Sequence, residues 1–149
     1  MKLEIIEVNK LPENFEKLIK ESVEEGHNFV SNTKKEWLSG KNSFSQNSEC
    51  FFLAYDDDTL IGCGGVNIDP YTVDKTIGRV RHLYISPQYR RRGIARRLIN
   101  KIINKSKISF SVLRLRANTV DLGSNYFYLS CGFIKTEGDE FETHRIQLK

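Results

Sequence analysis

The sequence predicts one α/β domain in which a mixed sheet is flanked by helices, and three observations lead to this prediction. Segments with the apolar spacing of helices are interspersed with short apolar runs that are typical of strands. Two of those runs enclose the turn at 56–59, which predicts an antiparallel hairpin. A later run is followed by a loop, a helix and another strand, and such crossovers are right-handed and join parallel strands. At 149 residues the chain has the length of one domain, so we expect 1–149 to fold as a single unit.

The elements follow in the order β-α-α-β-β-β-α-β-α-β-β. Pro12 suits the first turn of the first helix and Gly26 its end. The predicted elements are a strand at 2–8, a helix from Pro12 to Gly26, a helix at Thr33–Ser39, strands at Cys50–Tyr55, Leu60–Ile68 and Ile77–Ile85, a helix from Ile94 to Ser106, a strand at Ser111–Arg116, a helix at 122–130, and strands at Gly132–Thr136 and Phe141–Leu148.

The helix that begins at Ile94 carries the strongest periodicity in the chain. Its apolar side chains step by one and three residues along one face, and its basic side chains fall on the other face. The apolar set is Ile94, Ala95, Leu98, Ile99, Ile102 and Ile103. The cluster of glycines at 62–65 lies within a predicted strand, which favours a bend or bulge over a nucleotide-binding loop.

Charge is distributed very unevenly along the chain. The formal net charge is +4, but residues 75–120 hold 13 Lys and Arg and no Asp or Glu, so the remainder carries −9. Such a block indicates an anionic partner for that segment alone. An apolar fraction of 39% excludes a disordered chain, and no run of eighteen apolar residues exists, so we expect no membrane span.

Cysteine and histidine provide no framework for a disulfide or a metal. Cys50, Cys63 and Cys131 are far apart, and the three histidines are scattered, so we expect reduced thiols and no metal. The first ten residues lack the features of a secretory signal. Together these observations predict a cytoplasmic protein.

The junction from Ile85 to Ala95 has the composition of a phosphate site. A predicted strand ends, a short loop turns, and a helix begins at Gly93, where unpaired backbone amides and the helix dipole favour an anion. Gly93 allows a positive φ and a close approach of the ligand, and Ala95 keeps the first turn open. Arg90, Arg91 and Arg92 surround this turn.

Two motifs resemble those of the GNAT superfamily of acetyl-CoA-dependent N-acetyltransferases. Arg90, Gly93 and Ala95 match its Gln/Arg-x-x-Gly-x-Gly/Ala signature, after an approach strand that ends in Leu83-Tyr84-Ile85-Ser86-Pro87. The segment 125–133 is similar to its Phe-Tyr-x-x-x-Gly-Phe signature, and the order of elements agrees over essentially the whole chain. The resemblance implies a mostly antiparallel sheet that is splayed between the fourth and fifth strands.

The resemblance also implies roles for individual residues. Acetyl-CoA would be the acyl donor, with amides around Leu83, Tyr84 and Ile85 on its pantetheine arm and thioester, and Tyr128 would protonate the leaving thiolate. The turn and the first residues of the helix would hold the pyrophosphate, and three further residues would contact the cofactor. The first set is Arg90, Arg91, Arg92, Gly93, Ile94, Ala95 and Arg96, and the second is Asn118, Ser124 and Phe127.

One family feature is missing from this chain. Many members carry a Glu on the approach strand that deprotonates the amine through water, but the matching position is Arg79. Other sources for a base are His82, which simple alternation would turn away from the site, and His144. A water chain, Asp69, Asp74 or a side chain of a flanking helix are further alternatives. Where the family often has Asn, seven residues before the tyrosine, this chain has Asp121.

The acceptor is expected to be a primary amine of a small molecule or peptide. Acidic residues at the end of the first helix, with Phe29 and Trp37, are consistent with an acidic cleft for a cationic amine, but a solvated helix face is the favoured explanation. These acidic residues are Glu21, Glu24 and Glu25. The alternative to an enzyme is a CoA-binding sensor or a degenerate enzyme. A nucleic-acid partner is disfavoured because few aromatic residues are interleaved with the arginines. The sequence fits either a monomer or a homodimer.

Overall fold

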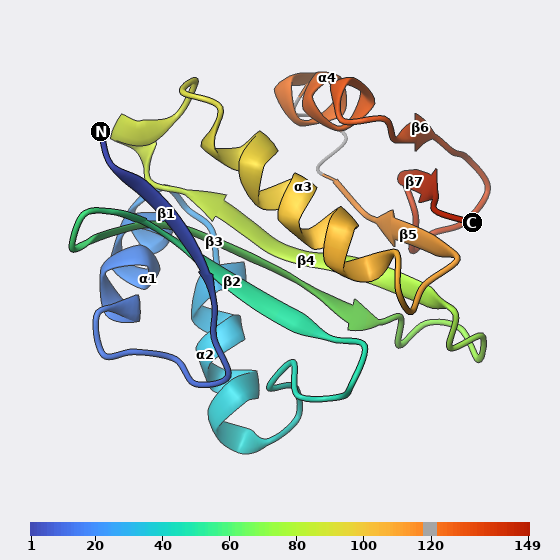
Figure 1. Cartoon of the computed structure of the whole chain (residues 1–149), viewed down its shortest axis with the longest axis horizontal. Coiled ribbons are helices and arrows are strands. Elements are labelled where there is room, and N and C mark those ends of the chain that lie inside the picture. The colour runs from blue at the N-terminus through green and yellow to red at the C-terminus, as the bar shows by residue number, and fades with distance from the viewer. Residues whose placement is uncertain (118–121) are drawn as a thin grey trace.

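A seven-stranded sheet lies between two helical layers in the computed structural model, which describes residues 1–117 and 122–149 (Figure 1). The strand order is β1-β2-β3-β4-β5-β7-β6. The strands are β1 (Leu3–Glu7), β2 (Cys50–Asp56), β3 (Thr59–Ile68), β4 (Ile77–Ile85), β5 (Val112–Leu115), β6 (Ile134–Lys135) and β7 (His144–Gln147). The helices are α1 (Phe15–Glu24), α2 (Phe29–Ser39), α3 (Ile94–Ser106) and α4 (Leu122–Ser130), with a 3₁₀ turn at Pro87–Tyr89.

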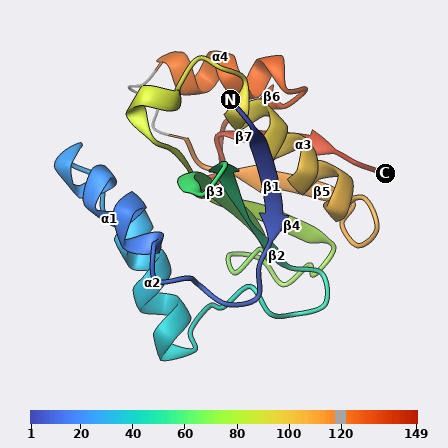
Figure 2. The ribbon, with the colours of Figure 1, turned by 60° about the vertical axis from the view of Figure 1, so that its left-hand side comes forward.

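Each face of the sheet has its own hydrophobic core. Helices α1 and α2 cover one face, and α3 covers the other with α4 beside it (Figure 2). We call these the α1/α2 face and the α3 face. The apolar stripe of α3 is buried as its periodicity predicted, with Leu98, Ile99 and Ile102 fully enclosed. The two-sided core explains why β2 and β3 are buried over most of their length.

Strands β4 and β5 form the only parallel pair between the described strands, and they pair only over Ile77–Arg79 and Val112–Arg114. Beyond Arg79 the two strands separate, and Figure 1 shows β4 continuing beneath α3 while β5 turns toward α4. The predicted fold class, a mixed and mostly antiparallel sheet splayed between its fourth and fifth strands, is therefore confirmed.

The boundaries differ from the sequence prediction in three places. Helix α1 begins at Phe15 and ends at Glu24 rather than running from Pro12 to Gly26, because Pro12 lies in the turn before the helix, where its carbonyl accepts from the Phe15 amide (3.1 Å). Helix α2 begins at Phe29 rather than at Thr33, because the Thr33 hydroxyl donates to the Phe29 carbonyl (2.9 Å) from inside the helix instead of capping it. The last two strands are shorter than predicted, since only Ile134–Lys135 and His144–Gln147 pair. No helix in the described ranges is both long enough and apolar enough to cross a bilayer.

Candidate functional site

Strand β4 contains a bulge at its centre. The pairing with β3 shifts between Cys63 and Gly65, and His82 takes a φ of +57°. The bulge turns His82 onto the α1/α2 face, where its ring contacts Thr33 and lies 6.4 Å from that of Phe29. Simple alternation would have placed it on the opposite face from Arg79. Burial, followed by the charge of Arg81, lowers the pKa of His82 to about 3, so the ring is neutral at physiological pH.

Two backbone amides of β4 point into the gap between β4 and β5. Ser86 donates to Ile61 of β3 (2.8 Å), so Ile85 and Leu83 direct their N–H groups away from β3 by alternation. Strand β5 pairs no further than Arg79, and therefore does not reach these amides. The result is a short row of donors along the open side of β4.

The gap leads to the start of α3, where the backbone forms a turn suited to an anion. Arg91 and Gly93 have φ of +63° and +81°, and the first helical hydrogen bond runs from Arg97 to Gly93 (3.1 Å). The amides of Ile94 and Ala95 precede that bond and have no helical acceptor. A Cβ added at Gly93 would meet no atom within 4 Å, so the space outside this turn is open.

The four arginines predicted for this turn are in different environments. Arg90 donates to both carboxylate oxygens of Glu25 (2.7 Å each), and its Nε donates to the Ile85 carbonyl (3.0 Å). Arg96 donates to the carbonyl and hydroxyl of Ser130. Arg91 and Arg92 are exposed, and no hydrogen bond or ion pair within the described ranges engages either guanidinium. They are the two side chains of this group that are available to a ligand.

The acidic end of α1 does not form an open cleft. Glu25 also accepts from the Tyr84 hydroxyl (2.6 Å), and the hydrogen bond from Arg90 lowers the pKa of its carboxyl. Glu21 accepts from Lys17 (2.8 Å) and from the Ser86 hydroxyl (2.9 Å). The aromatic residues expected beside them pack into the core, with the Trp37 ring 5.5 Å from that of Phe51 and the Phe29 ring 6.0 Å from that of Tyr84.

Tyr128 lies on α4 with its ring among apolar neighbours. It is half-buried, and its ring centroid is 5.1 Å from that of Phe127, 5.7 Å from that of Phe133 and 5.7 Å from that of His144. Burial raises the pKa of the Tyr128 hydroxyl, so it holds its proton at neutral pH. Ser124 lies one turn earlier on the same helix, and Asn118 and Asp121 fall outside the described residues.

His144 is a buried structural residue in this arrangement. Its side chain is engaged at both ring nitrogens, with the Thr143 hydroxyl (2.9 Å) and with the amide oxygen of Asn125 (2.8 Å). Burial lowers the pKa of His144. The residue therefore ties β7 to α4, the helix that carries Tyr128.

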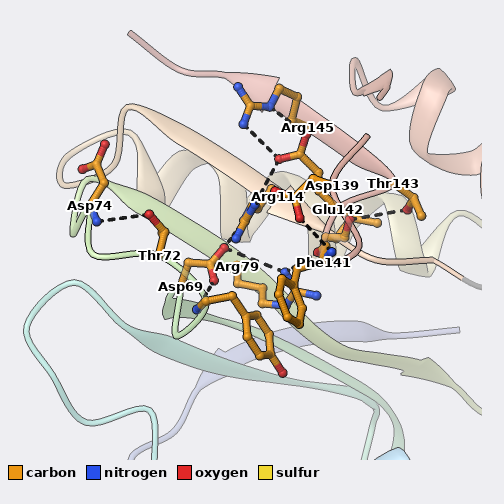
Figure 3. A network of polar contacts seen from close by, with 12 residues as sticks. Asp69, Thr72, Asp74, Arg79, Arg114, Asp139, Phe141, Glu142, Thr143 and Arg145 are labelled. Atoms are coloured by element: carbon orange, nitrogen blue, oxygen red, sulfur yellow. Dashed lines mark hydrogen bonds and ion pairs between the residues drawn. The ribbon is translucent and has the colours of Figure 1, made fainter. Parts of the chain in front are cut away.

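Arg79 belongs to a buried ionic network at the end of β4 that pairs with β5, which we call the closed end (Figure 3). Arg79 and Arg114 flank Asp69; Arg114 donates to the Asp69 carboxylate, and the Arg79 guanidinium lies 3.8 Å from it. Arg114 also reaches Asp139 (2.7 Å), and Arg79 donates to the Phe141 carbonyl (2.7 Å). Asp69 is 2% exposed and Asp74 bonds only within its own loop, so neither carboxylate faces the gap as a free base.

The network fastens two loops across the sheet. The ring of Tyr71, from the loop after β3, stacks on Phe141, from the loop before β7, at 4.2 Å and 4°. The Arg79 guanidinium covers the Tyr71 ring at 4.8 Å. The position where the family often has a glutamate is thus part of a structural cluster in this chain.

A polar pocket opens on the α1/α2 face beside the bulge. It has a volume of about 480 Å³ and lies between the end of α2, the loop 40–49, the end of β3 and Arg81 of β4. The side chain of Arg81 was counted only as part of the basic block in the sequence prediction. No sequence signal separated it from the other arginines, because its position in a pocket depends on the bulge and on the loop 40–49.

Comparisons with known proteins agree with the fold. Residues 47–135 match the family model described as the acetyltransferase (GNAT) domain. Human N-acetyltransferase 8 is 28% identical over 98 residues, which are 64% of this chain and 43% of the human protein, so the chain spans less than half of that relative.

Solved structures extend the likeness to the whole chain. A structure from Exiguobacterium sp. 255-15, described as a candidate acetyltransferase, is 28% identical with a TM-score of 0.87, covering 99% of this chain and 94% of that one. The PaiA N-acetyltransferase of Thermoplasma acidophilum, solved in complex with coenzyme A, has a TM-score of 0.73 at 21% identity and covers 99% of both chains. At that identity the second likeness concerns the fold alone.

Proposed function

This chain belongs to the GNAT acetyltransferase family, because the family's domain model covers more than half of it, and we propose on this premise that it transfers the acetyl group of acetyl-CoA to a primary amine of a small molecule or peptide. One observation carries the proposal. The amides of Leu83 and Ile85 line a gap that leads directly to the start of α3, where Gly93 leaves the helical amides open.

The residues present fit acetyl-CoA as the acyl-donor substrate. The amides at the start of α3 and the exposed guanidinium groups of Arg91 and Arg92 suit its phosphates, because the dipole and the charges there have the same sign. The open row of amides on β4 suits the polar groups of an extended arm. A donor aimed at the thioester oxygen stabilises the charge that develops there, an effect that costs about 10²–10³ in rate when one such donor is lost.

The proposed reaction is a direct transfer. The amine nitrogen bonds to the carbonyl carbon, the carbon–sulfur bond breaks, and its electron pair leaves with the sulfur. Tyr128 donates its proton to that sulfur and regains one from solvent, and the amine nitrogen loses one proton. Strand β4 carries no Asp or Glu, so we assign the loss of the amine proton to water rather than to a side chain. The products are the acetamide and free CoA.

Two measurements test this function. Thiol release from acetyl-CoA should be detected over a panel of amines, and CoA binding should be detected by calorimetry without an acceptor. Gly93→Val should abolish CoA binding in a folded protein, because a side chain at a φ of +81° is strained and projects into the open space of the turn. Gly138→Val is the matched control, since Gly138 has a φ of +93° and open surroundings but lies before β7.

The outcomes distinguish an acetyltransferase from a CoA-binding sensor. Release of thiol with any amine supports the transferase. CoA binding without thiol release across the whole panel would replace it with a CoA-binding sensor, which the arginine at position 79 makes the second candidate. Wild-type CoA affinity in Gly93→Val would overturn the placement of the phosphates.

A further inference from the structure

We propose that the pocket beside Arg81 binds a carboxylate of the acceptor, so that the preferred acceptor is a primary amine with a carboxylate close to it, as in an amino acid. This inference rests on the proposed function and names the class of its second substrate. It differs from the sequence hypothesis of a cationic amine in an acidic cleft.

The guanidinium of Arg81 has no hydrogen-bond or ion-pair partner among the described residues. It projects from the α1/α2 face of β4 and lines the pocket, and it is half-buried. Its neighbour Arg79 is held by Asp69 and Phe141, whereas no hydrogen bond or ion pair within residues 1–117 and 122–149 engages Arg81. A guanidinium in this position offers paired donors that match a carboxylate, and a partly desolvated site strengthens such a bond.

The contacts that form the pocket wall opposite Arg81 do not involve the Arg81 side chain. Gly65 faces Arg81 across the β3–β4 ladder, and a Cβ there would come within 2.5 Å of the Cys50 carbonyl and 3.0 Å of the Phe44 ring. The absence of a side chain lets Phe44 lie against the strand. The loop that carries Phe44 is thereby brought over the α1/α2 face beside Arg81.

Hydrogen bonds then fix this loop in place. Asn42 and Asn67 exchange two side-chain hydrogen bonds of 2.8 Å, and Glu49 accepts from Asn67 (3.1 Å) and from the Ile68 amide (2.9 Å). Asn67 is 4% exposed. The pocket is therefore formed before any ligand enters, which lowers the entropic cost of binding.

The charges around the pocket favour a zwitterion over a simple anion. Arg81 and Lys41 are positive, and Glu36 and Glu49 are negative. Glu49 is bonded to β3 and to the Gln46 amide, whereas no ion pair engages the Glu36 carboxylate within the described part of the chain. Arg81 can thus hold one carboxylate, while the carboxylate of Glu36 disfavours a second negative charge on the same molecule.

The pocket is close to the proposed reaction centre. Arg81 precedes Leu83 by two residues, which in a regular strand would span roughly 7 Å, and the bulge at His82 makes this the upper limit of the spacing. A small amino acid held at Arg81 can therefore extend its amine toward the gap between β4 and β5. A larger separation between amine and carboxylate would not suit this spacing.

The test compares matched acceptors in the thiol-release assay with the whole protein. Each free amino acid is paired with its amide and with the amine that lacks the carboxylate. We expect kcat/KM to be at least tenfold higher for the free amino acid. Arg81→Gln should lower that value about tenfold or more while leaving the amide and the simple amine nearly unchanged, and Arg81→Lys should restore part of the preference. Lys101→Gln, which removes a charge from the exposed side of α3, is the control.

Two results would overturn the inference. One is equal kcat/KM for free amino acids and their amides in the wild type, and the other is an equal loss for all three acceptors in Arg81→Gln. Acceptor binding is measured separately by calorimetry with CoA present. If CoA binds but no acceptor is acetylated, the proposed function fails, and the carboxylate site is then judged by whether Arg81→Gln weakens amino-acid binding.

Discussion

Arginines lie at both ends of β4, but they are buried in an ionic network at one end and exposed at the other. At the first end, over Ile77–Arg79, the strand pairs with β5 and its arginine is 7% exposed inside an ionic network. At the second end, over Leu83–Ile85, no described strand pairs with the side of β4 that faces away from β3. The arginines that follow at 91 and 92 are exposed, and Arg92 lies over the Tyr89 ring at 5.2 Å. The first end is closed by acids from distant loops, and the second is left open.

This difference separates stability from binding along one strand. Removing one member of a buried ion pair destabilises the fold, because the other charge is left unpaired in a medium of low polarity. An exposed arginine contributes little to stability and is free to meet a ligand. Variants at the closed end should therefore change unfolding, and variants at the open end should change binding and turnover.

The largest effect is expected at the closed end. Asp69→Ala removes the carboxylate that Arg114 and Arg79 share, and should lower the free energy of unfolding by about 3–5 kcal/mol in urea denaturation. Asp74→Ala is the control, because among the described residues the Asp74 carboxylate accepts only from Thr76 at the surface, and its loss should cost less than about 1 kcal/mol. Equal destabilisation by the two variants would show that the network is not the source of stability.

Chemistry at the open end should depend on Tyr128. Tyr128→Phe should lower kcat by about 10- to 100-fold, because it removes the proposed proton donor, while CoA affinity and unfolding free energy change little. Burial raises the pKa of Tyr128, so any alkaline decline in kcat caused by its ionisation should lie above the ordinary tyrosine value of about 10. An unchanged kcat would remove Tyr128 from the mechanism.

The bulge between the two ends should make stability depend on pH. His82 has a folded pKa of about 3, below the ordinary value near 6.5, so below pH 6.5 the unfolded chain binds a proton that the folded chain does not. The wild type should therefore lose about 2 kcal/mol more than His82→Gln between pH 7 and pH 5. Parallel pH profiles for the two proteins would contradict the buried, neutral state of His82.

The smallest effect should follow from removing the exposed arginines. The double variant Arg91→Ala, Arg92→Ala should weaken CoA binding about tenfold at low salt, with a smaller difference at high salt because exposed charges are screened. Its unfolding free energy should change by less than about 0.5 kcal/mol. A large loss of stability instead of affinity would erase the distinction between the two ends.

Local patterns in the sequence predicted most of the fold. Helix α3 was predicted within one residue of its observed bounds because its apolar period is regular and Gly93 marks its start. The bend in the glycine-rich strand was expected and is present as the register shift of β3 against β4. The start of α2 was missed, since Phe29 and Val30 enter the helix without a capping side chain to mark them.

Side-chain partners over long distances could not be predicted. The basic block was interpreted as a site for an anion, yet Arg79, Arg90 and Arg114 bind acids that lie 10 to 65 residues away in the chain. The orientation of His82 depended on a bulge that period-two alternation does not contain. Arg81 became distinct from its neighbours only when the loop 40–49 was placed against it.

The hydrogen bonds of the pocket wall affect how the specificity of this protein can change. Asn42, Asn67 and Glu49 maintain the loop by bonds among themselves and with β3, and none of these bonds involves Arg81. Residue 81 can therefore be exchanged without dismantling its surroundings. Selection or laboratory evolution can change the choice of acceptor at this single position while the rest of the scaffold stays the same.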